Sequence, residues 1–132
     1  MQQKPYTTTY TTVWPTCDNV VISLCEKWGG VPVQVGIVEV RVFKDGKHKG
    51  EAYLWNLFVN PECRGRGYAR ILMQAAYDRA QESGCHTCVL EWDMKESPRW
   101  VFQWYTRLGY DEKEFGHDNA LMKLPIKENN EI

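Results

Sequence analysis

A segment rich in glycine and arginine, RGRGYAR at positions 64–70, joins two stretches of different hydrophobic period. Residues 51–59, on its N-terminal side, have the composition of a strand, and Asn60-Pro61 ends that strand because proline cannot donate to a sheet. On its C-terminal side, apolar residues recur at helical spacing: Ala69, Leu72, Met73, Ala76 and Ala80. This stripe predicts a helix over residues 67–83. The chain must therefore pass from a strand into a helix through a short, glycine-containing loop.

The chemistry of this loop suits a phosphate-bearing ligand. Glycine lets backbone N–H groups approach an anion without a Cβ in the way. The start of a helix adds unpaired N–H donors and a partial positive charge. Arg64, Arg66 and Arg70 contribute three formal positive charges. We expect a pyrophosphate here, with a plain strand-to-helix connection as the alternative. The P-loop string is absent, and Arg70 occupies the position of the last glycine in a dinucleotide fingerprint.

The N-terminal half is predicted to be a β-meander. Residues 33–43 alternate apolar and polar side chains and form the clearest strand, and the threonine-rich residues 6–13 are β-prone. The polar residues 44–47 contain an Asp-Gly pair and predict a hairpin turn before the next strand. The sequence of residues 14–30 is compatible with either a helix or a strand, although the β-branched side chains within residues 19–27 favour a strand.

The C-terminal half is predicted to contain strands and a second helix. Gly84 ends the first helix, and Ser97 and Pro98 provide an N-cap and a first helical position for the second. The expected elements are a strand over 86–94, a helix to about Leu108, and closing strands over 110–115 and 119–126. We expect a single α/β domain over residues 1–132, with helices packed on a mixed sheet and a frayed polar tail at 126–132.

Composition excludes several classes of protein. The chain has 16 Lys+Arg and 17 Asp+Glu, and a formal net charge of −1 gives no general reason to bind nucleic acid or an anionic membrane. No apolar run approaches the ~18 residues of a transmembrane helix, and the start lacks a secretory segment, so we expect a cytoplasmic protein. The five cysteines are expected to be reduced thiols, with no metal site among them.

Several motifs occur in an order that a known family shares. Residues 64–69 match an Arg/Gln-x-x-Gly-x-Gly/Ala loop, and residues 57–61 match the Leu-x-Val-x-Pro end of the strand before it. Residues 104–110 match a Leu-Tyr-x-x-x-Gly-Phe motif, with Trp104 in place of its Leu and Tyr110 in place of its Phe. Residues 120–124 match the last strand of the same family. Over about residues 36–124, the chain resembles the GNAT superfamily, the acyl-CoA-dependent N-acyltransferases.

The resemblance implies a mixed, mostly antiparallel sheet that is splayed in the middle, with helices packed on it. The family also inserts two helices after its first strand, and these help to wall the acceptor site. Only residues 14–30 could supply them here, so we expect these N-terminal helices to be reduced or absent. The acceptor pocket would then be open, or a second chain would complete it in a homodimer. Pro98 stands where the family usually has an Asn that contacts the cofactor.

The resemblance further implies an N-acetyltransferase that moves an acetyl group from acetyl-CoA to a primary amine, by direct attack in a ternary complex and without a metal. The alternative is a non-catalytic GNAT-like module that binds acyl-CoA. The acceptor is expected to be a small-molecule or peptide amine, and the net negative charge of residues 91–96 favours a cationic one. The implied cofactor-binding residues are Leu57, Phe58 and Val59 for the pantetheine, and Arg64, Gly65, Arg66, Gly67, Tyr68, Ala69 and Arg70 for the pyrophosphate.

Two residues are expected to carry the proton transfers. Tyr105 aligns with the family's general acid, since a tyrosine is protonated at neutral pH and can donate to a thiolate. Glu91 occupies a strand position similar to that of the catalytic base in the branch that acetylates ribosomal-protein N-termini. Asp93 shares its face of the strand and is a second candidate base, Glu51 is a third, and a base that acts through water is also consistent with the sequence.

Overall fold

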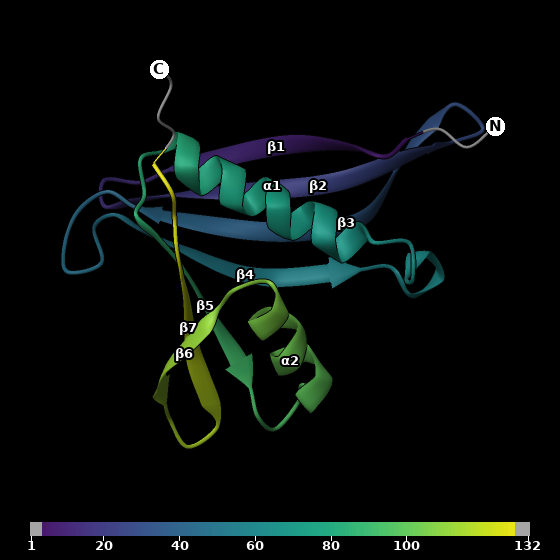
Figure 1. The fold of residues 1–132 in the computed structure, drawn as a ribbon. Helices are drawn as coiled ribbons and strands as arrows, with labels where there is room; N and C mark the ends of the chain where they lie inside the picture. Colours follow the sequence, from purple (N-terminus) through teal and green to yellow (C-terminus); the bar gives the residue numbers. More distant parts are fainter. Residues whose placement is uncertain (1–3, 129–132) are drawn as a thin grey trace.

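The computed structural model describes residues 4–128, which form one seven-stranded sheet, two α-helices and a short 3-10 helix (Figure 1). The strands follow the order β1-β2-β3-β4-β5-β7-β6 across the sheet. Their bounds are β1 Tyr6–Val13, β2 Cys17–Trp28, β3 Val31–Phe43, β4 Glu51–Val59, β5 Thr87–Asp93, β6 Asp111–Phe115 and β7 Asn119–Pro125. The helices are η1 Pro61–Cys63, α1 Tyr68–Glu82 and α2 Arg99–Arg107. Each strand and each long helix that the sequence predicts is present.

The sheet divides into two parts between β4 and β5. Strands β1 to β4 form an antiparallel meander, and β5, β7 and β6 form a second antiparallel set. The parallel pairing of β4 with β5 joins the two sets through three residue pairs and ends at Tyr53↔Val89. Beyond that pair the strands diverge, and Figure 1 shows β5, β6 and β7 turning away from the meander. The expected mixed, mostly antiparallel sheet that is splayed in the middle is confirmed.

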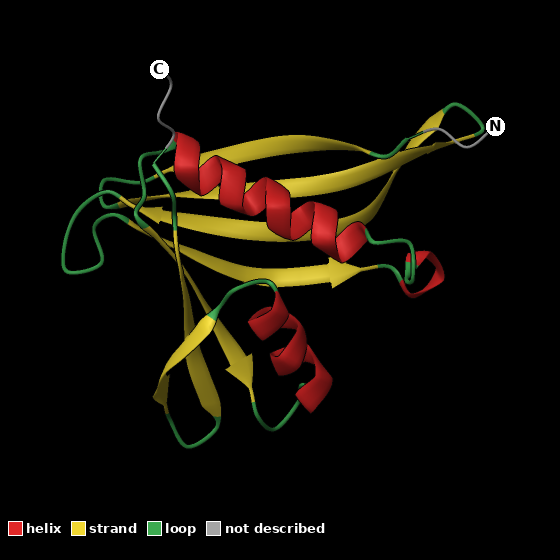
Figure 2. Ribbon diagram, viewed as in Figure 1, coloured by secondary structure: helices red, strands yellow, loops and turns green. Residues whose placement is uncertain are grey.

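Helix α1 covers one face of the meander (Figure 2). Alternate residues of β2, β3 and β4 are buried on that face: Val20, Ile22, Leu24, Val38, Val40, Val42, Ala52 and Leu54. The helix buries Leu72, Met73, Ala76 and Ala80 against them, which is most of the predicted apolar stripe. A Cβ at Gly36 would lie 2.9 Å from Leu72 Cδ1, so the glycine allows α1 to approach β3 closely.

Helix α2 packs on the same side of the sheet, over the second part. Cys88 pairs with the buried Ala52, and Leu90 and Trp92 follow it on the same face of β5. The Trp92 ring meets the Phe102 ring of α2 with centroids 5.0 Å apart. Because both helices occupy one face, the opposite face has no helical cover within residues 4–128. Residues 14–30 form β2 and its flanking turns, so the expected absence of the N-terminal helices is confirmed.

The predicted hairpin between β3 and β4 is present: the strands end at Phe43 and resume at Glu51, and the connection spans residues 44–50. One local prediction is wrong. Pro98, not Ser97, is the N-cap of α2: its ψ of 149° is extended, and its carbonyl accepts the N–H of Val101 at 3.0 Å. The N–H of Ser97 instead donates to the carbonyl of Asp93 at 3.0 Å.

The end of the described chain is held to the body of the protein. The N–H of Ile126 donates to the carbonyl of His86 at 2.9 Å, and the N–H of Lys127 donates to Tyr77 Oη at 3.0 Å. The rest of the predicted frayed tail, residues 129–132, lies outside the described residues. The five cysteines are buried and unpaired, and burial raises the pKa of Cys88 to about 12. Neither long helix among residues 4–128 has the length and hydropathy needed to cross a membrane.

Candidate functional site

A cleft of about 540 Å³ lies between the end of β4, the start of α1 and helix α2. All but one of the cofactor-binding residues that the sequence implies contribute to its walls. These are Leu57, Phe58, Val59, Arg64, Gly65, Gly67, Tyr68, Ala69 and Arg70. The exception is Arg66, whose Nη1 lies 3.6 Å from Glu26 Oε1 of β2. Helix α2 adds an aromatic wall with Trp100, Trp104 and Tyr105.

The loop before α1 exposes backbone donors to this cleft. Gly67 is the N-cap of α1 with a left-handed φ of 78°, and it supplies no side-chain hydrogen bond to the first turn. Gly65 is also left-handed, with φ of 82°. A Cβ at either glycine would meet no atom within 4 Å, so backbone conformation rather than space requires glycine here. The unpaired N–H groups of the first turn and the helix dipole make this end of the cleft favourable for an anion.

Arg64 anchors the loop to β4. Its Nε donates to the carbonyl of Val59 at 3.1 Å, and its guanidinium carbon lies 5.7 Å from the centroid of the Phe58 ring. Two contacts to the preceding strand thus fix the position of one of the three formal positive charges of this segment. Arg70, which is exposed on the first turn of α1, contributes its charge to the cleft wall.

Strand β4 contains a bulge just before its last residues, Leu57 to Val59, which line the cleft. The register steps from Glu39↔Trp55 to Ile37↔Phe58, so three residue steps on β4 face two on β3. Asn56 at the bulge has φ of 57° and is the one non-glycine residue with positive φ among residues 4–128. Asparagine tolerates this conformation better than most residues, but no pattern in the local sequence predicts the bulge.

A chain of polar side chains on the helix-free face holds this bulge. Asn56 Nδ2 donates to Glu39 Oε2 at 2.8 Å, and Asn19 Nδ2 donates to Glu39 Oε1 at 3.0 Å. The indole of Trp55 donates in turn to Asn19 Oδ1 at 3.3 Å. Asn19 is the one buried polar or charged residue among residues 4–128. The network therefore ties β2, β3 and β4 together at the point where β4 departs from regular pairing.

Tyr105 lines the cleft from helix α2. Its ring lies 5.4 Å from that of Trp104 and 6.3 Å from that of Tyr110, measured between centroids. Burial raises the pKa of Tyr105 above 10.0 because the phenolate would lose hydration. The hydroxyl is consequently a proton donor throughout the neutral range.

Glu91 lies on the other face of the sheet. Its neighbours Leu90 and Trp92 point toward α2, so its own side chain points to the helix-free face, where it is exposed. Its Oε2 accepts a hydrogen bond from Asn119 Nδ2 at 2.7 Å. Burial and, after it, the charge of Glu91 raise the pKa of Tyr53, which places the Glu91 carboxylate near the last paired residue of β4.

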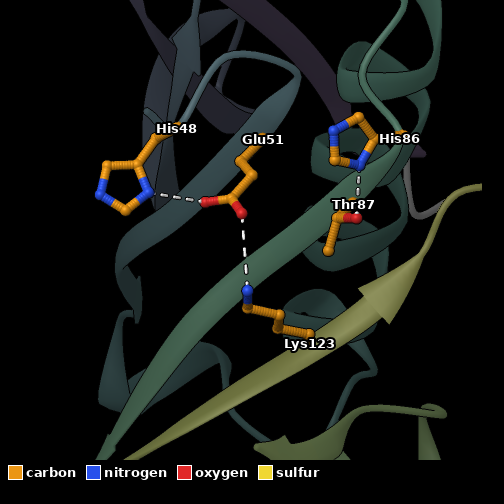
Figure 3. Close-up of polar contacts among 5 residues, drawn as sticks. All are labelled: His48, Glu51, His86, Thr87 and Lys123. Carbon is orange, nitrogen blue, oxygen red and sulfur yellow. Dashed lines mark hydrogen bonds and ion pairs between the residues drawn. The ribbon is translucent and has the colours of Figure 1, made fainter. Parts of the chain in front are cut away.

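The other two carboxylates proposed as bases have structural contacts. Asp93 Oδ1 accepts the N–H groups of Lys95 at 2.9 Å and of Glu96 at 3.1 Å, and so it orders the turn after β5. Glu51 lies between His48 Nδ1 at 3.0 Å and Lys123 Nζ at 3.5 Å (Figure 3). Glu51 begins β4 whereas the cleft lies at its end, a separation of roughly 20 Å at the rise of a strand.

Comparison with known proteins identifies the family. The profile of the acetyltransferase (GNAT) family matches residues 3–110. The PaiA N-acetyltransferase of Thermoplasma acidophilum, solved with coenzyme A, has a TM-score of 0.66 and 16% identity over 81% of this chain and 60% of its own. The ribosomal-protein-S18-alanine N-acetyltransferase of Escherichia coli has a TM-score of 0.64 and 21% identity over 90% of this chain and 75% of its own.

The spermidine/spermine N-acetyltransferase SpeG of Vibrio cholerae has a TM-score of 0.63 and 19% identity over 81% of this chain and 64% of its own. At these identities the likenesses concern the fold. No curated protein sequence matches the chain.

The positive φ of Asn56 predicts an unusual order of stability among its variants. Asn56→Gly keeps the left-handed backbone, whereas Asn56→Ala must strain it, so we expect the alanine variant to be less stable by about 1 kcal/mol. Asn60, with an ordinary φ of −50°, is the matched control, and there alanine should be at least as stable as glycine. Urea unfolding of the four variants measures both differences. Equal stabilities of the two Asn56 variants would contradict the role of the bulge conformation.

Proposed function

Because the chain belongs to the GNAT acetyltransferase family, we propose that it moves an acetyl group from acetyl-CoA to a primary amine. The observation that carries this proposal is the cleft at the split of the sheet, with an uncapped helix start at one end and the protonated Tyr105 phenol on its wall. In the reaction the amine nitrogen attacks the thioester carbonyl carbon in a ternary complex, and the carbon–sulfur bond breaks. The amine loses a proton and the leaving thiolate gains one.

The cofactor is proposed to lie along the cleft. The N–H groups from Gly65 to Arg70 would hold the pyrophosphate at the start of α1, where the glycines leave room and the dipole favours an anion. The backbone of residues 57–59 would hold the pantetheine and polarise the thioester carbonyl, because this part of β4 lies beyond the last pair with β5 and has a free edge on that side. Pro98 replaces the asparagine that usually assists here, so the loop carries a larger share of the binding.

Tyr105 and Glu91 are proposed to act from opposite faces of the sheet. Tyr105, on the cleft side, would give its proton to the thiolate of coenzyme A. Glu91, exposed on the helix-free side, would take the proton of the amine, directly or through water. The split between β4 and β5 joins the two faces, so an amine could reach the thioester from the side opposite the cofactor.

The acceptor is proposed to be a cationic amine, small or peptidic. Glu91 and Asp93 are both exposed on the helix-free face, and their charges would attract a protonated amine before it is deprotonated. The names of two structural neighbours include a polyamine and a ribosomal-protein alanine as acceptors, and an open face suits either kind. The same openness favours a second candidate, a module that binds acyl-CoA without transferring the acyl group.

A homodimer is proposed to form through the β1 edge. Strand β1 has a free edge of eight residues, YTTTYTTV, without a charge or a proline to discourage pairing. Two copies could pair antiparallel along this edge and satisfy the same backbone groups in each. Tyr10 and Val13 of this strand are exposed and would gain cover from the partner.

Light scattering at tens of micromolar tests the dimer. We expect the mass of two chains for the wild type and of one chain for Thr9→Lys, because a lysine on the edge opposes pairing. Thr9→Val keeps the strand propensity without the charge and should remain dimeric. A wild-type chain that is monomeric and fully active would contradict the proposal.

Substitution of Gly67 tests the pyrophosphate site. Gly67→Asp and Gly67→Asn have side chains of nearly equal size, and both residues tolerate a left-handed backbone, so the pair differs chiefly in charge. We expect Gly67→Asp to bind coenzyme A at least about fivefold more weakly than Gly67→Asn, which corresponds to about 1 kcal/mol. Calorimetric titration measures both affinities. Equal affinities in folded variants would place the pyrophosphate elsewhere.

The pH–rate profiles of Tyr105→Phe and Glu91→Gln test transfer and its two proton steps. Tyr105→Phe keeps the ring packing and should lower the rate by about 100-fold or more at every pH up to 10. Glu91→Gln should lower the rate most at low pH and recover as pH rises, because more of the amine arrives deprotonated. Released thiol, measured with a panel of amines, reports the rate. Wild-type profiles for both variants would contradict these roles, and coenzyme A binding without thiol release by the wild type would favour the non-catalytic candidate.

A further inference from the structure

The carboxylate of Glu26 contacts two residues before α1 and the first residue of that helix, although Glu26 belongs to β2 and does not line the cleft. Tyr68 Oη donates to its Oε2 at 2.9 Å. Its Oε1 lies 3.6 Å from Arg66 Nη1 and 3.9 Å from Cys63 Sγ. The Glu26 side chain is 13% exposed, and Tyr68 and Cys63 are buried, so the carboxylate sits beneath the loop.

The loop needs such a support because its own sequence gives it little rigidity. Gly65 and Gly67 are both exposed and left-handed, and no protein atom would meet a Cβ at either position. Glycine loses more conformational freedom on ordering than any other residue, so a loop with two of them is ordered by contacts around it. Arg64 provides one contact, on the side of β4. Glu26 provides three more: to Cys63 before the glycines, to Arg66 between them and to Tyr68 after them.

The charges around Glu26 are arranged so that its carboxylate does not repel an anion strongly. Arg66 places a guanidinium beside one oxygen, and the Tyr68 hydroxyl donates to the other. Burial, followed by the hydrogen bond to Glu26, raises the pKa of Tyr68, so the hydroxyl remains a donor to that oxygen. Tyr68 is also the first residue of α1, and its hydroxyl therefore ties the start of the helix, where the backbone donors lie, to β2.

We propose that Glu26 is a positioning residue for the cofactor: through Tyr68, Arg66 and Cys63 it fixes the loop in the conformation that presents the N–H groups of the first turn of α1 to the pyrophosphate. The proposal rests on the proposed function of this cleft. It assigns a role in cofactor affinity to a residue of the N-terminal meander, about 40 residues before the loop in the sequence. The role concerns only the phosphate-bearing part of the ligand, because among the described residues the polar partners of the Glu26 carboxylate are Cys63, Arg66 and Tyr68, and none lies in 57–59 or 97–105.

Two ligands that differ in phosphate separate this role from a general effect on folding. Coenzyme A carries the pyrophosphate, and pantetheine shares its thiol-bearing arm without any phosphate. In Glu26→Ala the loop loses its support, and we expect coenzyme A affinity to fall about tenfold while pantetheine affinity stays within about twofold. Glu26→Gln keeps an oxygen to accept the Tyr68 hydroxyl and should recover most of the loss. In steady-state assays Glu26→Ala should raise the KM for acetyl-CoA and leave kcat nearly unchanged.

Two further variants complete the experiment. Glu62→Ala is the matched control, because it removes the same charge from an exposed position on the same loop and should not weaken coenzyme A binding. Tyr68→Phe removes only the hydroxyl that Glu26 accepts, so it should reproduce part of the loss even where Glu26→Ala fails to fold.

The affinities for coenzyme A and pantetheine distinguish failure of the positioning role from failure of the proposed function. Unchanged coenzyme A affinity in Glu26→Ala and Tyr68→Phe, or equal losses for coenzyme A and pantetheine, would overturn the positioning role and leave the proposed function standing. Failure of the wild-type chain to bind coenzyme A at all would instead overturn the proposed function and this proposal with it.

Discussion

The short parallel pairing between β4 and β5 is the constraint on which the rest of this structure depends. Three residue pairs hold the two halves of the sheet together, and beyond Tyr53↔Val89 both strands continue without each other. A parallel connection requires a crossover, and here helix α1 supplies it. The loop that begins the crossover is therefore brought to the open end of the pair. The unpaired backbone groups of β4 that remain there need partners, and a ligand laid along the strand could supply them.

The protein keeps this opening with two different kinds of interaction on its two faces. On the helical face, α1 and α2 bury apolar side chains against their own halves of the sheet, and the cleft lies between them. On the other face, the polar chain from Trp55 through Asn19 and Glu39 to Asn56 holds the bulge of β4. Hydrogen bonds are directional, whereas apolar packing is not, so the polar chain can specify one backbone conformation at a position where strand pairing is lost.

The sequence predicts the elements well because their signals are local and periodic. The alternation in residues 33–43 and the apolar stripe of α1 are properties of neighbouring residues, and both elements appear within two residues of the predicted bounds. The bulge at Asn56 and the support from Glu26 could not be predicted in this way. Each depends on partners 17 and 42 residues away, Glu39 and Tyr68, and no local propensity records such a pairing. The misplaced cap at Ser97 has a different, local origin: the N–H of Ser97 donates to the carbonyl of Asp93, four residues earlier, in the turn after β5.

The positions of Tyr105 and Glu91 follow from the same split and suggest why the two proton transfers would not interfere. Burial on the helical face keeps the Tyr105 phenol protonated, which suits a donor to a thiolate. Exposure on the opposite face gives the Glu91 carboxylate access to water, which suits an acceptor that passes a proton to solvent. Were both groups in one cavity, the carboxylate could accept a hydrogen bond from the phenol and so take that donor away from the thiolate. The sheet keeps them apart, and the opening between β4 and β5 would let an amine from the helix-free face meet a thioester held in the cleft.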